Sequence, residues 1–215
     1  MREVDKAEAL RRLEEEIRTC TRCRLHATRT HAVPGEGPYN AMVMFIGEAP
    51  GYYEDKQGKP FVGAAGRYLN KLLAQSGLRR EEVYITNIVK CRPPKNRDPL
   101  PDEIQACEPF LDRQIELIDP RIIVTLGRFA LHHFIPGASI TRVHGQPRKI
   151  GKRLFFPVFH PAAGLYQPKW QPLLEEDFRK LGQLVQALRE NPDSVSYEQL
   201  SLFPENGEAR GDTTQ

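Results

Sequence analysis

Apolar side chains recur along this chain in two different patterns. Across residues 4–18 they fall at steps of three and four, which predicts an amphipathic helix. Four shorter runs are almost continuously apolar and end in turn residues, as buried strands do: 42–46, 83–89, 122–126 and 154–159. Helical patterns separate or follow these runs, at 64–76, 101–118, 127–134 and 173–189.

Strands that alternate with helices predict a mostly parallel sheet with helices on both faces. We therefore expect an α/β fold, a three-layer α/β/α sandwich around a short, mostly parallel four-stranded sheet. A turn-rich segment, 33–40, leads into the first strand. Because open α/β sheets bind ligands at the carboxyl ends of their strands, the loops that follow the strands are the first place to look for a site.

The composition predicts one globular domain with a tail. The chain has 215 residues, of which 40% are hydrophobic and 27% charged. We expect the domain to span 1–190, and the polar, acidic segment 191–215 to be disordered. No run approaches the roughly 18 apolar residues that a membrane helix needs, and the first residues lack the apolar core of a signal peptide. We therefore expect a cytoplasmic protein with no membrane partner.

Charge is distributed unevenly between the domain and the tail. The net charge is +3, and the tail contributes five acidic residues and one basic residue, so the first 190 residues carry +7. A basic domain is compatible with a polyanionic partner such as DNA. Many basic domains bind nothing anionic, so the charge alone leaves both interpretations open.

Four cysteines are candidate metal ligands. Cys20 and Cys23 are two residues apart, whereas Cys91 and Cys107 lie far downstream with fifteen residues between them. Zinc modules usually show two close pairs, and cubane clusters can gather ligands from distant segments. Buried cysteines without a metal are also common. The spacing leaves an iron–sulfur cluster, a zinc site and plain core cysteines open.

Three predicted strands run into loops with unusual residues. The first is followed by Gly47-Glu48-Ala49-Pro50-Gly51, in a glycine- and proline-rich segment that also holds Glu54 and a lone Phe61. The second contains Asn87, and the fourth ends at His160. A histidine after a strand is more often structural than catalytic, but Glu48 and Asn87 at the same sheet edge favour a site.

A basic loop follows Asn87. Residues 90–97, Lys-Cys-Arg-Pro-Pro-Lys-Asn-Arg, carry four bases in eight positions. Two prolines stiffen the loop, which suits contacts to phosphates. A solvated surface loop explains the same composition equally well.

Taken in order, these motifs resemble the signature of the family 4 uracil-DNA glycosylases. The resemblance rests on 47–51, 54–63, Thr86–Arg97 and His160-Pro-Ala, and it covers roughly residues 15–189. It implies a monofunctional enzyme of base excision repair that hydrolyses the N-glycosidic bond of uracil in DNA and leaves an abasic site. It also implies a [4Fe–4S] cluster held by Cys20, Cys23, Cys91 and Cys107. Tyr52-Tyr53 stands where many relatives carry acidic residues.

The resemblance also assigns roles to the site residues. His160 stabilises the leaving uracil anion, and Glu48 favours the sugar cation and orients the water. Asn87 reads the base edge with one donor and one acceptor, and Phe61 stacks on the flipped ring. The remaining candidates for substrate contact are Gly47, Ala49, Glu54, Asn96 and Leu165, with Tyr166 as the alternative to Leu165 for the wedge that fills the gap in the duplex.

Two rival functions make different demands on the sequence. A non-catalytic iron–sulfur or zinc DNA-binding module would need no Glu48, Asn87 or His160. A zinc-containing nucleotide hydrolase would need a phosphate loop such as Gly-x4-Gly-Lys-Ser/Thr, which the sequence lacks.

The tail contains a short apolar segment in otherwise polar surroundings. This pentapeptide, 199–203, resembles the motif by which bacterial repair proteins dock on the sliding clamp, with Gln199, Leu200, Leu202 and Phe203 as its contacts. A segment that folds back onto the domain is the alternative. We expect the protein itself to be a monomer that binds uracil-containing DNA, single- or double-stranded.

Overall fold

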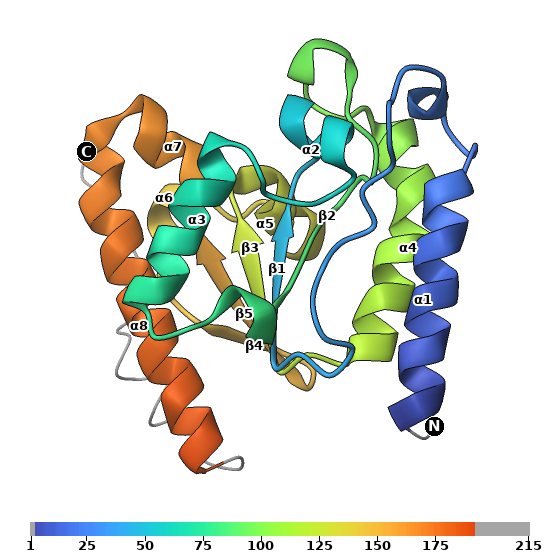
Figure 1. Cartoon of the computed structure of the whole chain (residues 1–215). Coiled ribbons are helices and arrows are strands. Elements are labelled where there is room, and N and C mark those ends of the chain that lie inside the picture. The colour runs from blue at the N-terminus through green and yellow to red at the C-terminus, as the bar shows by residue number, and fades with distance from the viewer. Residues whose placement is uncertain (1–2, 192–215) are drawn as a thin grey trace, which may run out of the picture.

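Five strands form one sheet in the order β2-β1-β3-β5-β4 in the computed structural model, which describes residues 3–191 (Figure 1). β1, β2, β3 and β5 are parallel, and β4 pairs with β5 in the antiparallel sense. The strands are β1 Val43–Gly47, β2 Tyr84–Asn87, β3 Ile122–Leu126, β4 Arg148–Ile150 and β5 Arg153–Val158. The predicted α/β class is confirmed.

Helices cover both faces of the sheet. They are α1 Glu3–Thr19, α2 Tyr52–Gln57, α3 Ala64–Gln75, α4 Pro101–Ile118, α5 Arg128–Phe134, α6 Ile140–Val143, α7 Pro161–Tyr166 and α8 Gln171–Glu190. Short 3-10 turns occupy Arg24–Ala27, Arg80–Glu82, Pro94–Asn96 and Pro168–Trp170. The paired α1 and α4 lie on one side of the sheet, and α3 and α8 lie on the other (Figure 1).

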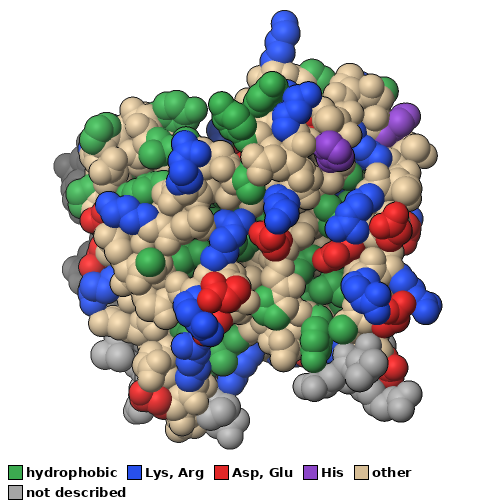
Figure 2. Space-filling view, in the orientation of Figure 1, with side chains coloured by type: hydrophobic (Ala, Val, Ile, Leu, Met, Phe, Trp, Pro, Cys, Tyr) green, Lys and Arg blue, Asp and Glu red, His purple; other side chains and the backbone are tan. Residues whose placement is uncertain are grey.

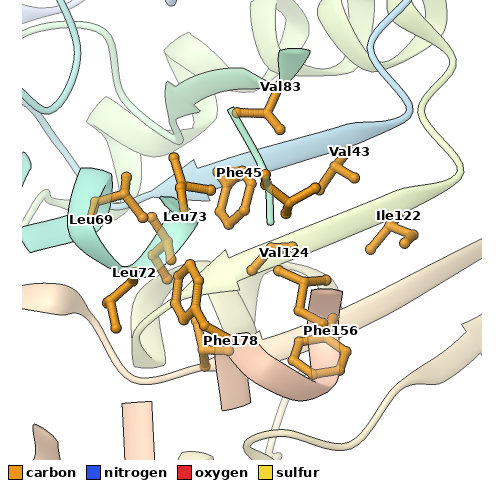
Figure 3. Close-up of a cluster of buried hydrophobic side chains, with 14 of the residues drawn as sticks. Val43, Phe45, Leu69, Leu72, Leu73, Val83, Ile122, Val124, Phe156 and Phe178 are labelled. Atoms are coloured by element: carbon orange, nitrogen blue, oxygen red, sulfur yellow. The ribbon is translucent and has the colours of Figure 1, made fainter. Parts of the chain in front are cut away.

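Burial on both faces explains why the strands are apolar without alternation. In β1, Val43 and Phe45 join the core under α3 and α8, whereas Met44 and Ile46 join the core under α1 and α4. Figure 3 shows the first of these cores, where the Phe45 ring lies 6.0 Å from that of Phe178 on α8. Successive strand residues point to opposite faces, so a strand covered on both faces needs apolar side chains throughout.

The expectation of four strands was wrong by one. β4 is an edge strand whose residues Arg148, Lys149 and Ile150 are all exposed. It pairs back on β5 through a turn at Gly151, which has a positive φ of 60°. An exposed edge strand needs no apolar run, because no helix covers it, and charged side chains protect such edges from pairing with other chains.

The long helices match their predicted positions, and the short ones were not predicted. α4 has the predicted bounds, and α1, α3, α5 and α8 agree to within two residues. α2, α6 and α7 have at most six residues each. A helix of one or two turns is too short to show an apolar period, and it is stabilised by its tertiary contacts.

The described residues bear on the expected absence of a membrane helix but not on the tail. No helix in 3–191 is long and apolar enough to cross a bilayer. The predicted disordered tail, with its apolar segment 199–203, lies outside the described residues, apart from Asn191.

Candidate functional site

A cavity of about 360 Å³ opens at the carboxyl edge of the sheet, where β1, β2 and β5 end. Residues of the loops that the sequence singled out line it, together with residues of α2 and α7. Its lining residues are Glu48, Ala49, Pro50, Gly51, Glu54, Phe61, Ala65, Asn87, Pro93, Asn96, Arg97, His160, Ala162 and Tyr166.

Phe61 is held in the cavity wall by a strained backbone. Its φ is 50°, a left-handed conformation that costs a non-glycine residue roughly 1–2 kcal/mol. Arg80 holds this loop, since its guanidinium donates to the carbonyls of Pro60 (2.6 Å) and Phe61 (3.2 Å). A Cβ at Gly47 would lie 2.8 Å from the Phe61 ring. These contacts hold Phe61 in its strained conformation and place an aromatic face at the end of β1.

Asn87 presents an unpaired acceptor. It is the last residue of β2, it is 2% exposed, and it lies opposite Gly47 in the register of β1 and β2. Its side-chain oxygen Oδ1 has no hydrogen-bond partner among the described residues. A buried polar atom without a partner costs free energy, so its presence in a cavity wall points to a ligand that donates to it.

Lys90 anchors the backbone of Asn87 from beneath. Its buried ammonium donates to Asn87 O, Thr86 Oγ1 and Gln114 Oε1, each at 2.7 Å. Gln114 lies on α4 and also donates to the Pro34 carbonyl at 2.8 Å. Burial lowers the pKa of Lys90 to about 7. This network joins β2, α4 and the loop before β1, and so holds the Asn87 backbone in place.

His160 is a neutral hydrogen-bond donor. It caps the N-terminus of α7, where its Nδ1 accepts from the Ala162 amide at 3.2 Å. Burial lowers the pKa of His160 to about 4, although the nearby Glu54 opposes the shift. The imidazole is therefore uncharged near neutral pH and carries its proton on Nε2. Its ring stacks on Phe61 with centroids 5.6 Å apart.

Glu48 follows β1 and is half-buried in the cavity wall. Its pKa is raised to about 7, mainly by burial and also by the Asp98 carboxylate, while Arg128 opposes the shift. A carboxyl group with a pKa near neutral is suited to proton transfer or to stabilising a cation.

Glu54 organises the loop that carries Phe61. Its Oε1 accepts from the amides of Val62 and Gly63, both at 2.9 Å. The neighbouring Asp55 is buried and accepts from the Thr30 amide at 2.8 Å. Glu54 lines the cavity. Its hydrogen bonds also hold the loop that carries Phe61, a role that the sequence did not indicate.

The basic loop is braced against α4. Arg97 donates twice to Glu103, at 2.6 and 2.9 Å, and Glu103 is fully buried. Asn96 lines the cavity, and its Oδ1 accepts from Arg92 Nε at 2.6 Å. Asn96 also has a positive φ of 55°. Together these contacts hold the loop in an irregular shape at the cavity mouth.

Most of the predicted site residues meet in this cavity. Glu48, Ala49, Glu54, Phe61, Asn87, Asn96 and His160 all line it. Gly47 is not a lining residue, but it packs against the side chains of Asn87 and Phe61, which are. Leu165 is not among the lining residues and is 41% exposed, whereas its neighbour Tyr166 is a lining residue and 85% exposed. Direct contact between these residues and a substrate stays a prediction.

Other lining residues were missed by sequence reasoning. Pro50, Gly51, Ala65 and Ala162 are small or apolar and carry no chemical signal. Pro50, Gly51 and Ala162 lie within the motifs that carry the resemblance, although they were not among the predicted site residues. Ala65 belongs to the first turn of α3 and reaches the cavity only through the packing of that helix.

A second, smaller cavity contains all four cysteines. Cys20 and Cys23 follow α1, Cys91 lies in the basic loop, and Cys107 lies on α4. None of the four forms a disulfide. No three His, Cys, Asp or Glu side chains in 3–191 converge closely enough to hold a single metal ion.

Three of the four sulfur atoms accept a hydrogen bond. Arg29 Nη1 donates to Cys91 Sγ at 3.0 Å, the Lys90 amide to Cys107 Sγ at 3.3 Å, and the Arg22 amide to Cys20 Sγ at 3.4 Å. Burial raises the pKa of Cys91 to about 11 and also raises those of Cys23 and Cys107. Donors aimed at buried sulfurs are typical of sites that hold thiolate ligands.

Comparison with known proteins gives a consistent result. Residues 34–187 match the family model described as the uracil DNA glycosylase superfamily. The type-4 uracil-DNA glycosylase of Sulfurisphaera tokodaii is 50% identical over 188 residues, which cover 83% of this chain and 86% of the relative. The type-4 enzyme of Archaeoglobus fulgidus is 47% identical, over 82% of this chain and 94% of the relative. That of Thermotoga maritima is 51% identical, over 70% and 80%.

Proposed function

The chain belongs to the type-4 enzymes of the uracil-DNA glycosylase superfamily, and we propose on this premise that its uracil site is the cavity at the carboxyl edge of the sheet. The protein is a hydrolase that cleaves the N-glycosidic bond of uracil in DNA, in base excision repair. The observation that carries the proposed site is the unpaired Oδ1 of Asn87, in one cavity with the neutral His160.

Asn87 would read the base. Uracil presents an N3–H donor beside its O4 acceptor, and an amide offers an acceptor and a donor in the same spacing. The unpaired Oδ1 would accept from N3–H, and Nδ2 would donate to O4. Cytosine has no N3 proton and carries an amino donor in place of O4. It would leave Oδ1 unpaired and set two donors against each other, which discriminates against it.

Phe61 would provide the face on which the uracil lies. A base inside a duplex is unreachable, so the enzyme must flip it into the pocket. Aromatic side chains stack on flipped bases, and the Phe61 ring lies beside Asn87 and His160 in a loop that Arg80 holds.

His160 and Glu48 would stabilise the two charges that develop. As the glycosidic bond breaks, the uracil gains negative charge and the sugar gains positive charge. The Nε2–H of neutral His160 would donate to uracil O2, and the Glu48 carboxylate would favour the sugar cation and orient the attacking water. Fixed charges and dipoles in a cavity that excludes water act strongly on such a transition state.

The basic loop and α7 would contact the DNA around the uracil. The loop brings Arg92 and Lys95 to the cavity mouth, where cations suit phosphates. We retain Leu165 as a substrate contact. Its neighbour Tyr166, which lines the cavity and is more exposed, is the better placed of the two for the wedge.

Strand breakage tests the activity directly. Incubation with an oligonucleotide that contains one uracil, followed by alkali, should cut the strand at that position, because alkali cleaves abasic sites. An oligonucleotide with thymine in the same position is the control. An intact uracil strand would contradict the proposed site and favour a DNA-binding module without activity.

The four cysteines fit a [4Fe–4S] cluster, which we propose as the cofactor. Four thiols line one cavity without converging on a point, and a cubane accepts one cysteine at each of four irons. When bound, the cluster would cross-link α1, the basic loop and α4 without acting on the substrate, since this hydrolysis moves no electrons. Cys91 lies near the start of the loop that carries Asn96, so the cluster would hold that loop beside the uracil cavity.

The Cys107→Ser variant should lose both the cluster and stability. We expect lower iron content, weaker visible absorbance and a lower unfolding temperature, because structural metal sites contribute on the order of 10 kcal/mol to folding. Ala106→Ser is the matched control, since it adds a hydroxyl to the same cavity and keeps all four thiols. A Cys107→Ser protein with unchanged absorbance and unfolding temperature would show that Cys107 is no ligand.

Uracil release should depend on pH through Glu48. Its carboxylate is the active form and its pKa is about 7, so kcat/KM should rise with pH through 7 and level off above it. Below 7 we expect a fall of about tenfold per pH unit. The pKa of His160 is about 4, so His160 stays neutral over this range and adds no second limb. In the Glu48→Gln protein, kcat/KM should no longer change with pH around 7. If the rise with pH persists, another group causes it.

Three further proposals concern the surroundings of the enzyme. We propose that the protein acts as a monomer in the cytoplasm, and that residues 199–203 of its tail dock on a sliding clamp. Tethering to the clamp would raise the effective concentration of the enzyme at DNA. Binding of a peptide that covers 197–205 to the purified clamp tests the last of these.

A further inference from the structure

Two exposed aromatic side chains lie beside the uracil cavity and have no role in the mechanism above. Tyr52 and Tyr53 begin α2 and are 49% and 59% exposed. Single exposed apolar residues are ordinary, but a cluster at the edge of a cleft marks a binding surface. Figure 2 shows hydrophobic side chains beside Lys and Arg along the top of the molecule, above the carboxyl edge of the sheet.

In the sequence, Tyr52 and Tyr53 lie between two residues that line the cavity. Gly51 precedes it and Glu54 follows it, and both line the cavity. Glu54 is bound to the amides of Val62 and Gly63, so α2 is fixed to the loop that carries Phe61. A nucleotide next to a flipped uracil would therefore lie within reach of the two rings.

The rings are held in a defined arrangement. Their centroids are 5.3 Å apart and their planes meet at 87°, so an edge of one ring meets the face of the other. The Arg92 guanidinium lies 5.2 Å from the Tyr52 centroid, and Lys56 Nζ lies 5.8 Å from it. Cation–π contacts of this kind orient Tyr52, and Tyr52 in turn supports Tyr53, the more exposed ring.

Cations next to the pair are available for the DNA backbone. Within 3–191, no carboxylate lies within 4.0 Å of a side-chain nitrogen of Arg92 or Lys95. Arg92 is bonded instead to Asn96, a neutral residue of the cavity lining. Aromatic faces alternating with cations are the arrangement by which proteins bind single strands without reading their sequence.

We propose that Tyr52 and Tyr53 form a stacking platform for an unpaired nucleobase next to the flipped uracil. The platform favours single-stranded DNA over duplex, because a base within a duplex is already stacked between its neighbours. Tyr53 supplies the stacking face, Tyr52 supports it, and Arg92 contacts the adjoining phosphate. This inference rests on the proposed uracil site.

Binding to a strand that the enzyme does not cleave tests the platform. Uracil on a 2′-fluorinated deoxyribose serves, because fluorine opposes positive charge on the sugar. Tyr52→Ala/Tyr53→Ala should raise the Kd for this single strand roughly 5- to 150-fold, the range for loss of one stacked base, and the Kd for the duplex less. The single-turnover rate on cleavable substrate at saturating enzyme should not change.

Two control proteins and one altered strand isolate the stacking. Tyr52→Phe/Tyr53→Phe keeps both rings and should bind as the wild type does. Ile150→Ala removes an exposed apolar side chain from the edge strand β4 and should change nothing. When abasic linkers replace both bases beside the uracil, the wild type should lose affinity and the double alanine variant should lose none.

The outcomes separate the platform from the uracil site. If the wild type releases uracil and the double alanine variant binds the single strand equally well, the platform is wrong. The platform is also wrong if the abasic linkers weaken binding by the double alanine variant as much as they weaken binding by the wild type, because the linkers and the alanines would then remove different interactions. If the wild type releases no uracil, the proposed uracil site is wrong, and the platform, which rests on that site, is wrong with it.

Discussion

The Asn87→Asp protein should lose uracil excision almost completely, on the order of 10⁴-fold in kcat/KM. The carboxylate would lie against uracil O4, and two acceptors repel each other where the amide had donated. Sites that hydrogen-bond a substrate reject a mismatched partner strongly because buried polar groups are left unpaired. The same carboxylate can accept from the amino group of cytosine, so weak cytosine excision should appear. Single-turnover assays on uracil- and cytosine-containing strands measure both effects.

The controls for Asn87→Asp concern charge and folding. Asn40→Asp adds the same charge at an exposed position just before β1 and should leave activity intact. Visible absorbance and unfolding temperature show whether the Asn87→Asp protein keeps its cluster and fold. If that protein is folded and keeps its activity and its preference for uracil, Asn87 does not read the base.

Glu48→Gln and His160→Ala should each slow uracil release by about 10²–10³-fold, while DNA binding is retained. Each change removes one group that interacts with charge in the transition state, and losses of this size follow the removal of one such group. Because they act on opposite ends of the same breaking bond, the combined variant should lose less than the product of the two single effects. Single-turnover rates and the Kd for DNA separate the chemical step from binding.

Conservative and remote changes complete this test. His160→Gln keeps a donor at the end of the side chain and should recover part of the rate lost in His160→Ala. Glu81→Gln removes an exposed carboxylate that pairs with Arg79, and it should have no effect on rate. Near-normal rates in both Glu48→Gln and His160→Ala would assign the chemistry to other residues.

The fold was largely predictable because burial between its layers determines where apolar residues occur in the sequence. β1 and β3 are buried on both faces, which requires continuous apolar runs, whereas the long helices α1, α4 and α8 bury one face, which requires apolar residues at steps of three and four. β4 and α7 were not predicted. The former is an exposed edge strand that, within 3–191, pairs with β5 alone, and the latter is a six-residue helix capped by His160. Neither leaves a periodic pattern.

The candidate site was predictable to the extent that parallel strands end at one edge. Glu48, Asn87 and His160 follow or end three different parallel strands, so the topology alone brings them together. Ala65 reaches the cavity through the packing of α3, so its place in the sequence did not indicate it, whereas Tyr166 was named only as the alternative wedge. Nor did the sequence show that Leu165 would lie beside the cavity lining rather than in it.

The sequence by itself determined which chemical groups this protein has and the order in which the strands deliver them. Only the tertiary structure decided which of these groups are protonated and which of their atoms lack a hydrogen-bond partner. Burial by distant segments keeps His160 neutral, and its own α7 amide directs its proton to Nε2. Burial beside Asp98 raises the pKa of Glu48, and packing against Gly47 leaves the Asn87 oxygen without a partner. These states depend on which atoms exclude water from each group, and those atoms come from segments far apart in the chain.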